Sequence, residues 1–202
     1  MSRLSTTSIV RKKIKQCLTV SVGVLSIVQL LAIAMAEPTL DPSQRFLLLA
    51  TKKTATMQKE LDEAAAAGYR ILAGSPTSGT EMAVILEKVT MPPDNYQYSL
   101  LATTKTATMQ KELDEAASRG FRLLPSTMIS KKRAFGGDEV VVVLEKAPNC
   151  FTVYEYLLLA TSRTSTLQKE MAEAVQEGYK VMGMVSRGEH MVILERSAEA
   201  GG

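Results

Sequence analysis

Few side chains in this chain have the chemistry of a catalytic or metal site. His190 is the only histidine among the 202 residues, and the two cysteines are Cys17 and Cys150. A zinc site normally needs four nitrogen, sulfur or carboxylate ligands, and so few imidazoles and thiols cannot supply one of the usual kind. His190 lies in a position that is apolar in two related segments. We therefore expect a structural role for it, rather than that of a ligand or general base.

Carboxylates could act in pairs as acid and base, and two sets of them recur. The first set lies in helical patterns and comprises Glu60, Glu63, Glu112, Glu115, Glu170 and Glu173. Their spacing places them beside Lys59, Lys111 and Lys169, which predicts solvated helix faces. The second set, Glu87, Glu145 and Glu195, ends apolar runs before a basic residue, which again predicts solvated pairs. The sequence contains no Walker or Rossmann phosphate loop, and we expect neither enzymatic activity nor a cofactor or metal.

Two other features could bind a ligand or partner. The first is a threonine-rich turn before each helical pattern, formed by Thr54 and Thr56, Thr106 and Thr108, and Thr164 and Thr166. Its hydroxyls could cap the helix, or hold an anion together with the free N–H groups. The second is the loop 126–138, which is longer than the equivalent loops 75–80 and 186–189. It is either a solvated insert or a partner-binding loop, and its candidate contacts are Lys131, Lys132, Arg133 and Phe135.

The elements that must position these residues are three copies of one unit. Residues 53–65 recur letter for letter as 105–117, and in altered form as 163–175. Each copy follows an apolar run that ends in Ala-Thr, and these Ala-Thr pairs are 52 and then 58 residues apart. Periods of this size indicate a repeated supersecondary unit. We predict repeats over 45–88, 96–146 and 154–196.

Each repeat has the pattern of a β-α-β-β unit. A short apolar run predicts a buried strand, and a period of about 3.6 then predicts an amphipathic helix. Gly68, Gly120 and Gly178 suit the left-handed residue that ends a helix. Two more apolar runs follow, and the last is the most strongly β-forming. A right-handed crossover and a hairpin then predict an α+β fold with sheet order 2-3-1, a split β-α-β arrangement.

The strands are apolar on both faces, so one helix cannot cover them. Leu47 and Leu49 alternate with Phe46, Leu48 and Ala50 along the first strand. A lone unit would leave one apolar face in water. We expect the three units to pack sheet face to sheet face, or edge to edge, around a shared core with pseudo-threefold character.

The first 36 residues have the three parts of a secretory signal. A basic stretch is followed by an apolar run from Cys17 to Ile33 and by the small residues Ala34-Met-Ala36. We expect cleavage after Ala36, which would make the protein periplasmic or secreted. The alternative is a membrane anchor formed by residues 17–36. After cleavage Cys150 is the only thiol, either a tolerated linker residue or the site of an intermolecular disulfide.

Charge gives no general attraction to nucleic acid. The whole chain has a net charge of +3, but residues 1–36 hold five basic and no acidic residues. Without them, 19 basic side chains stand against 21 acidic ones, a net charge of −2. We expect a protein partner of unknown identity, no nucleic acid, and membrane contact only through an uncleaved N-terminal segment. Whether the protein forms a homo-oligomer stays an open question at this point.

The third repeat resembles a bacterial family of short β-α-β-β domains of unknown function. The resemblance rests on 154–159 (YEYLLL), 167–171 (LQKEM), 177–182 (EGYKVM) and 191–196 (MVILER), and all three repeats match it in order and spacing. The family typically has Gly-Trp after the helix, whereas this chain has Tyr69, Phe121 and Tyr179. The resemblance implies the fold and carries over no catalytic residue.

Taken together, these patterns favour an exported, non-enzymatic interaction or structural module of the cell envelope. The alternative is a small-ligand-binding protein, or an enzyme, with a pocket between repeats.

Overall fold

The computed structural model describes residues 43–89, 96–150 and 152–198. Contacts divide the chain into two units, Met1–Asp41 and Pro42–Gly202, and every described residue belongs to the second. The predicted signal or anchor therefore lies outside the described residues. In the described part of the chain, no helix is long and apolar enough to cross a membrane.

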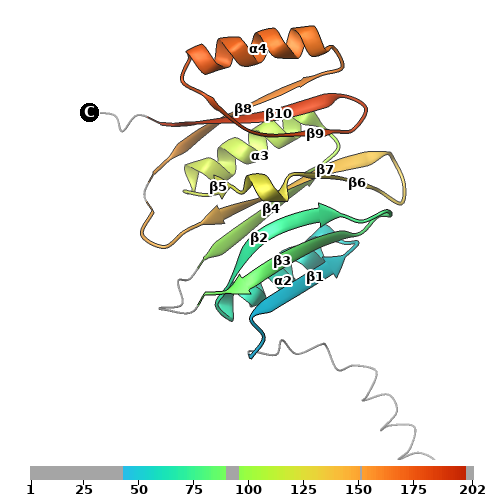
Figure 1. The fold of residues 1–202 in the computed structure, drawn as a ribbon, viewed down its shortest axis with the longest axis vertical. Coiled ribbons are helices and arrows are strands. Elements are labelled where there is room, and N and C mark those ends of the chain that lie inside the picture. Colours follow the sequence, from blue (N-terminus) through green and yellow to red (C-terminus); the bar gives the residue numbers. More distant parts are fainter. Residues whose placement is uncertain (1–42, 90–95, 151, 199–202) are drawn as a thin grey trace, which may run out of the picture. The chain divides into compact units, whose positions relative to one another are not determined.

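The described residues form an α+β fold of three repeated β-α-β-β units, as the sequence predicts (Figure 1). The first unit comprises β1 (Phe46–Thr51), α2 (Thr54–Ala66), β2 (Tyr69–Pro76) and β3 (Met82–Lys88). The second comprises β4 (Gln97–Thr103), α3 (Thr106–Ser118), β5 (Arg122–Leu123), the 3₁₀ turn η1 (Pro125–Thr127), β6 (Ile129–Lys132) and β7 (Asp138–Lys146). The third comprises β8 (Tyr154–Thr161), α4 (Thr164–Gln176), β9 (Lys180–Ser186) and β10 (His190–Ser197).

The last strand of each unit lies in the middle of its sheet. The orders are β1-β3-β2, β4-β7-β5 and β8-β10-β9, with antiparallel pairing throughout. This confirms the predicted order. The middle place suits the most apolar strand because it is paired on both edges and packed on both faces: Val140 to Leu144 are all buried.

The sequence predicts correctly how the helices end, but not how they begin. Gly68, Gly120 and Gly178 follow the helices with φ of 84°, 84° and 90°, the predicted left-handed residues. At the other end, the predicted caps Thr54 and Thr56 are wrong, because α2 already starts at Thr54 and its cap residue makes no side-chain hydrogen bond. The hydroxyl that is used belongs to the strand-ending threonine of each unit, which accepts the N–H two residues later.

The units do not pack sheet face to sheet face around one shared core. Instead, the helices of the first and second units, α2 and α3, each lie against the next unit. In one cluster α2 contributes Met57 and Leu61 between its own sheet and Val141 and Val143 of the second sheet. A second cluster repeats this with α3, between its own sheet and Ile193 of the third. A third, smaller cluster holds α4 on its own sheet alone. The repeated helix is therefore the packing element between sheets, and the expectation of one shared sheet core is wrong.

The predicted loop 126–138 is largely structured. Strand β6 pairs with β7, from Ile129 opposite Val141 to Lys132 opposite Asp138. The turn before it is held by Thr127, which is buried and whose hydroxyl accepts a 2.9 Å hydrogen bond from Val143 N. The insert thus extends the second sheet, and only residues 133–137 form its tip.

Candidate functional site

Buried glutamates mark the junctions between units. Glu195 in β10 is only 5% exposed. It accepts hydrogen bonds from Arg122 of the preceding unit, with Nη2 to Oε1 at 2.8 Å, and from the Tyr156 hydroxyl at 2.9 Å. That hydroxyl in turn accepts the backbone N–H of Leu123 at 2.7 Å. Arg122 and Leu123 of the second unit thus bind Glu195 and Tyr156 of the third, so the group forms a clamp that joins the two units.

The same clamp joins the first and second units. Glu145 is 6% exposed and accepts two hydrogen bonds from Arg70, at 2.8 and 3.0 Å. Tyr98 donates to Glu145 at 3.3 Å and accepts the N–H of Ile71 at 3.0 Å. Burial raises the pKa of Tyr98 and of Tyr156 above the ordinary tyrosine value, because ionisation would place a phenolate in a desolvated site beside a carboxylate.

The prediction of solvated glutamates at the strand ends holds only for the first unit. Glu87 is partly exposed and pairs at 2.8 Å with Arg45 of its own unit. Glu145 and Glu195 are buried because the first unit covers the sheet of the second, and the second unit covers the sheet of the third. The signal in the sequence was the recurrence of Arg at 70 and 122, directly after the glycine-aromatic position. Since all their polar atoms are engaged across a junction, these residues are structural in the arrangement shown.

On the helices, the predicted solvated pairs form. Lys59–Glu63, Lys111–Glu115 and Lys169–Glu173 lie 3.5, 3.6 and 3.7 Å apart, all well exposed. Glu112 departs from the prediction, because one of its oxygens is buried without a hydrogen-bond partner among the described residues. Burial accordingly raises the pKa of Glu112.

A basic pocket lies where the second unit's insert meets the first unit. It has a volume of about 320 Å³. Its lining combines the turn before α2 with the tip of the insert: Lys52, Lys53, Thr80, Lys131, Lys132, Arg133, Ala134, Phe135 and Glu139. Five basic side chains thus stand against one carboxylate. The structure brings together two features that the sequence placed 80 residues apart along the chain, the first threonine turn and the insert.

The residues of the predicted binding loop differ in their exposure. Lys131 is buried at 4%, and its ammonium group donates to the carbonyls of Lys52 and Thr80 and pairs with Glu139 at 2.7 Å. It therefore holds the insert on the first unit and is not available to a partner. Lys132 and Arg133 are exposed, and Phe135 is 88% exposed. These three remain candidates for binding.

The threonines predicted as anion sites have three different surroundings. At α3 the site is filled from within the chain, because Thr106 donates to the Glu189 carboxylate at 3.2 Å. Arg187 also donates to the Thr106 hydroxyl and to the Thr104 carbonyl. At α2 the turn borders the basic pocket, and Lys131 takes the role of Arg187. At α4 the side chains of Thr164 and Thr166 make no hydrogen bond with any described residue.

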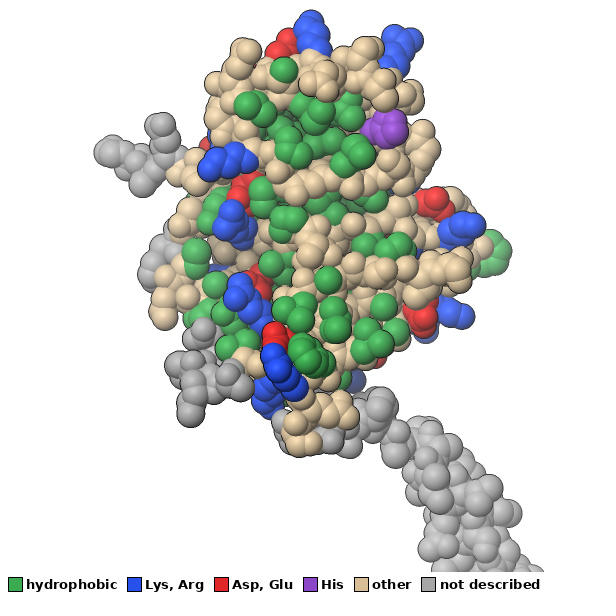
Figure 2. Space-filling model, in the orientation of Figure 1, with side chains coloured by type: hydrophobic (Ala, Val, Ile, Leu, Met, Phe, Trp, Pro, Cys, Tyr) green, Lys and Arg blue, Asp and Glu red, His purple; other side chains and the backbone are tan. Residues whose placement is uncertain are grey.

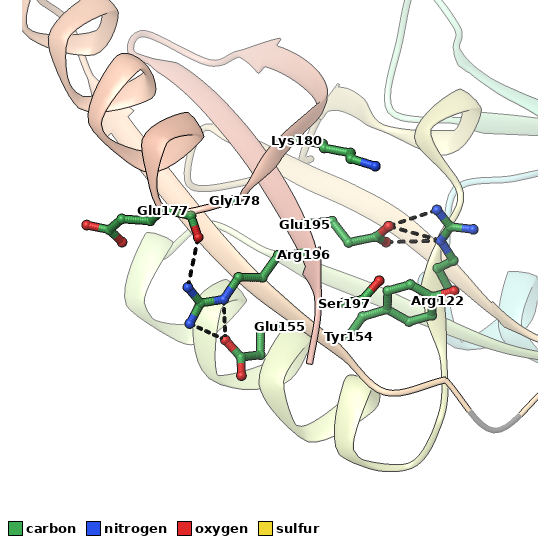
Figure 3. Close-up of a pocket in the computed structure, with 9 residues that line it drawn as sticks. All are labelled: Arg122, Tyr154, Glu155, Glu177, Gly178, Lys180, Glu195, Arg196 and Ser197. Atoms are coloured by element: carbon green, nitrogen blue, oxygen red, sulfur yellow. Dashed lines mark hydrogen bonds and ion pairs between the residues drawn. The ribbon is translucent and has the colours of Figure 1, made fainter. Parts of the chain in front are cut away.

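A second cleft, of about 690 Å³, lies around the junction of the second and third units (Figure 3). Its charged groups are mostly paired with one another: Arg122 with Glu195, and Arg196 with Glu155 and the Glu177 carbonyl. Lys180 faces the cleft with no hydrogen bond or ion pair to a described residue. Lys180 is therefore the cationic group most available to a ligand here, since the guanidinium groups are engaged.

The remaining chemistry-bearing residues do not converge. His190 Nδ1 lies 3.1 Å from the Ser186 hydroxyl on the facing strand, in an exposed hairpin. Cys150 is half-buried with a free thiol. Within residues 43–89, 96–150 and 152–198, no group of His, Cys, Asp and Glu side chains could hold a metal ion.

Comparison with other proteins adds no relative. No protein-family model, curated protein or solved structure matches this chain. The resemblance to the bacterial β-α-β-β family stays a prediction.

Proposed function

We propose that this chain is an exported, non-enzymatic protein that binds an acidic protein partner through the basic pocket between its first two units. The proposal rests on one observation, the convergence of Lys52, Lys53, Lys132 and Arg133 around one hollow. The body that follows the predicted signal is close to neutral, so this cluster is a local feature and not part of a generally basic surface.

The pocket has two properties that suit a protein partner. Lys131 anchors its floor by three contacts to both units, so the exposed bases project from a fixed base. Phe135 stands at its rim almost fully exposed, and aromatic side chains of this kind often supply the anchors of interfaces. An acidic segment with an apolar residue nearby would match both the charge and the ring. Of the glutamates considered for acid/base chemistry, Glu145 and Glu195 are occupied in joining units.

A defined acidic probe tests the proposal. Binding of fluorescent poly-glutamate to the wild type should be saturable and should weaken with salt, because exposed charges are screened. The triple variant Lys52→Ser, Lys132→Ser, Arg133→Ser should lose about tenfold or more in affinity, since each contact contributes a few tenths to 1 kcal/mol.

The matched control removes the same number of charges elsewhere. Lys59→Ser, Lys111→Ser, Lys169→Ser deletes three exposed lysines, each paired with a glutamate of its own helix and none lining the pocket, and it should bind as the wild type does. Equal losses in the two variants would mean that net charge, and not the pocket, governs binding. Unchanged binding in the pocket variant would show that the pocket does not bind the acidic probe.

A second candidate function is the binding of a small charged ligand in the cleft at Lys180. Its volume of about 690 Å³ is in the range of ligand sites. A thermal-shift screen with a metabolite library separates the two. A saturable hit that Lys180→Ala abolishes, and that the pocket variant keeps, would favour this candidate.

A further inference from the structure

The two junctions inside the chain are built by one recurring contact. The outer side of a helix packs on the helix-free face of the next sheet, and a glutamine on that helix fastens the next strand. Gln58 Nε2 donates to the Tyr98 carbonyl at 3.0 Å, and its Oε1 accepts Leu100 N at 2.8 Å. Gln110 does the same to Tyr156 and Leu158, at 2.9 and 2.8 Å. The glutamine amide thereby pairs with the free edge of a strand, as another strand would.

The third unit ends in the helix side of this contact, and no described segment of the chain receives it. The equivalents of Val175, Ala65 and Ala117, are 6% and 3% exposed, whereas Val175 is 53% exposed. Val181 on β9 is likewise exposed, although its equivalents Ile71 and Leu123 are buried. We call the side chains Gln168, Met171, Ala172 and Val175 the outer stripe of α4. The stripe has Ala172 where α2 and α3 have aspartates, which are exposed, and is therefore more apolar than the corresponding surfaces of α2 and α3.

The first unit carries the sheet side of the same contact, and no other described segment covers it. Its open face consists of Phe46, Leu48, Ala50, Leu72 and Ile85. Leu48 is 68% exposed, and Phe46 is exposed where the equivalent tyrosines of the second and third units are 4% exposed. In Figure 2, hydrophobic side chains gather over the strands of this unit. An apolar sheet face of this kind usually marks an interaction site.

Polar groups at the two ends are also complementary when placed as in the internal junctions. Gln168 corresponds to Gln58 and Gln110, and the outer edge of β1 is unpaired within its sheet. Lys180 corresponds to Arg70 and Arg122, and Glu87 to the glutamates that those arginines bind.

The helix start shows the same match. Glu81 occupies the position of Glu189, which binds Thr106 at the start of α3. Thr164 is the equivalent hydroxyl on α4, and neither it nor the Glu81 carboxylate has a partner among the described residues. Both halves of the glutamine–strand contact and of the threonine–glutamate contact are therefore present at opposite ends of the chain.

We propose that the outer stripe of α4 docks on the open face of the first sheet of a second copy, so that chains associate head to tail. Gln168 then pairs with the backbone of the second copy's β1, and Lys180 approaches Glu87. The contact is heterologous, because each chain uses a different surface at its two ends. It continues the internal stack as a ring or an open row of chains.

Some hydrogen bonds and ion pairs of the internal junctions have no counterpart in the proposed contact, so it should be weaker than those junctions. Phe46 lacks the hydroxyl of Tyr98 and Tyr156, and Arg45 already pairs with Glu87. The hairpin of the first unit has no basic residue equivalent to Lys131 or Arg187. Association therefore depends mainly on apolar burial and is reversible and concentration-dependent, in contrast to the permanent internal junctions.

Two single variants test the proposal, because each blocks one end only. The full chain is expressed with its own N-terminal segment, and the protein is purified as the host cell processes it. Its mass is then followed by sedimentation velocity over a range of concentrations. The wild type should grow beyond two chains. Leu48→Glu blocks the sheet end and Val175→Glu blocks the helix end. Each should remain a single chain, with at least about tenfold weaker association, because it buries an unpaired carboxylate. Both positions are exposed in the chain, and unchanged thermal unfolding will show that the variants fold.

Mixing the two variants gives the decisive result. Leu48→Glu keeps an intact α4 and Val175→Glu keeps an intact open face, so an equimolar mixture should form a 1:1 pair and grow no further. Lys169→Gln is the control, since it changes the charge by the same amount and the equivalent Lys111 stays 78% exposed in an internal junction. It should associate as the wild type does.

Three outcomes would overturn the proposal. A wild type that stays a single chain at every concentration would show that the ends do not bind. Self-association that survives Val175→Glu but not Leu48→Glu would indicate a twofold dimer through two open sheet faces. A mixture that does not pair would show that the two ends are not each other's partner.

Discussion

Removal of the Tyr156 hydroxyl should destabilise the protein through two hydrogen bonds at one buried junction. In Tyr156→Phe the ring and its packing stay, so the change isolates the oxygen. The buried N–H of Leu123 loses its acceptor at 2.7 Å, and Glu195 loses a donor at 2.9 Å. An unsatisfied buried donor costs about 1–3 kcal/mol. Glu195 keeps Arg122, so its loss adds about 1 kcal/mol, and we expect a total of about 2–4 kcal/mol.

The assay is equilibrium unfolding in urea, in which the midpoint should fall while the slope stays constant. Tyr154→Phe is the control, because it removes the same atom two residues away, where the hydroxyl makes no hydrogen bond with a described residue. It should lie within about 0.5 kcal/mol of the wild type. Tyr98→Phe should cost somewhat less than Tyr156→Phe, since its two bonds are longer, at 3.0 and 3.3 Å. A Tyr156→Phe variant no less stable than Tyr154→Phe would refute the clamp as described.

Two further predictions follow from the same junctions. Arg122→Leu should destabilise the protein by about 3–5 kcal/mol, because it leaves the Glu195 carboxylate buried without its counter-charge. Arg45→Leu should cost at most about 1 kcal/mol, because Glu87 is partly exposed. Equal unfolding midpoints for the two variants would contradict this. The raised pKa of Tyr98 and Tyr156 means that the folded state holds these protons longer than the unfolded state. Their contribution is therefore complete below the ordinary tyrosine value of about 10 and is lost as the pH rises above it, by up to about 1.4 kcal/mol per pH unit for each tyrosine, and Tyr156→Phe should reduce this alkaline slope in a urea-unfolding series.

The unit and its strand order could be predicted from the sequence because their signals are local. Alternation in β1, helical periodicity from Met57, and Gly68 after the helix each depend on residues close in the chain. Recurrence of this pattern three times removed ambiguity about where each element lies. The handedness of a strand-helix-strand crossover then left few arrangements of the third strand.

The packing between units could not be predicted, because it depends on which surfaces meet. The sequence shows that a sheet has two apolar faces, and both a sheet and a helix could cover the second one. Leu61 looks like an ordinary core position of an amphipathic helix, although it is completely buried between two units. In the sequence, Gln58 has the pattern of a solvated helix residue, but in the structure its side chain binds the edge of β4.

For the candidate site, the sequence by itself determined which residues carry charge and which segments are repeated or inserted. Only the tertiary structure decided what those charges do. Lys131 and Lys132 are neighbours with the same side chain, yet one is buried against the first unit and the other is exposed, because successive residues of β6 point to opposite sides. Glu145 and Glu195 are buried and Glu87 stays near the surface, because the preceding unit covers the sheet of the second and of the third unit, whereas no described segment covers the first unit's sheet in the same way. Burial is a property of the neighbour as much as of the residue, and the neighbour is set by the fold.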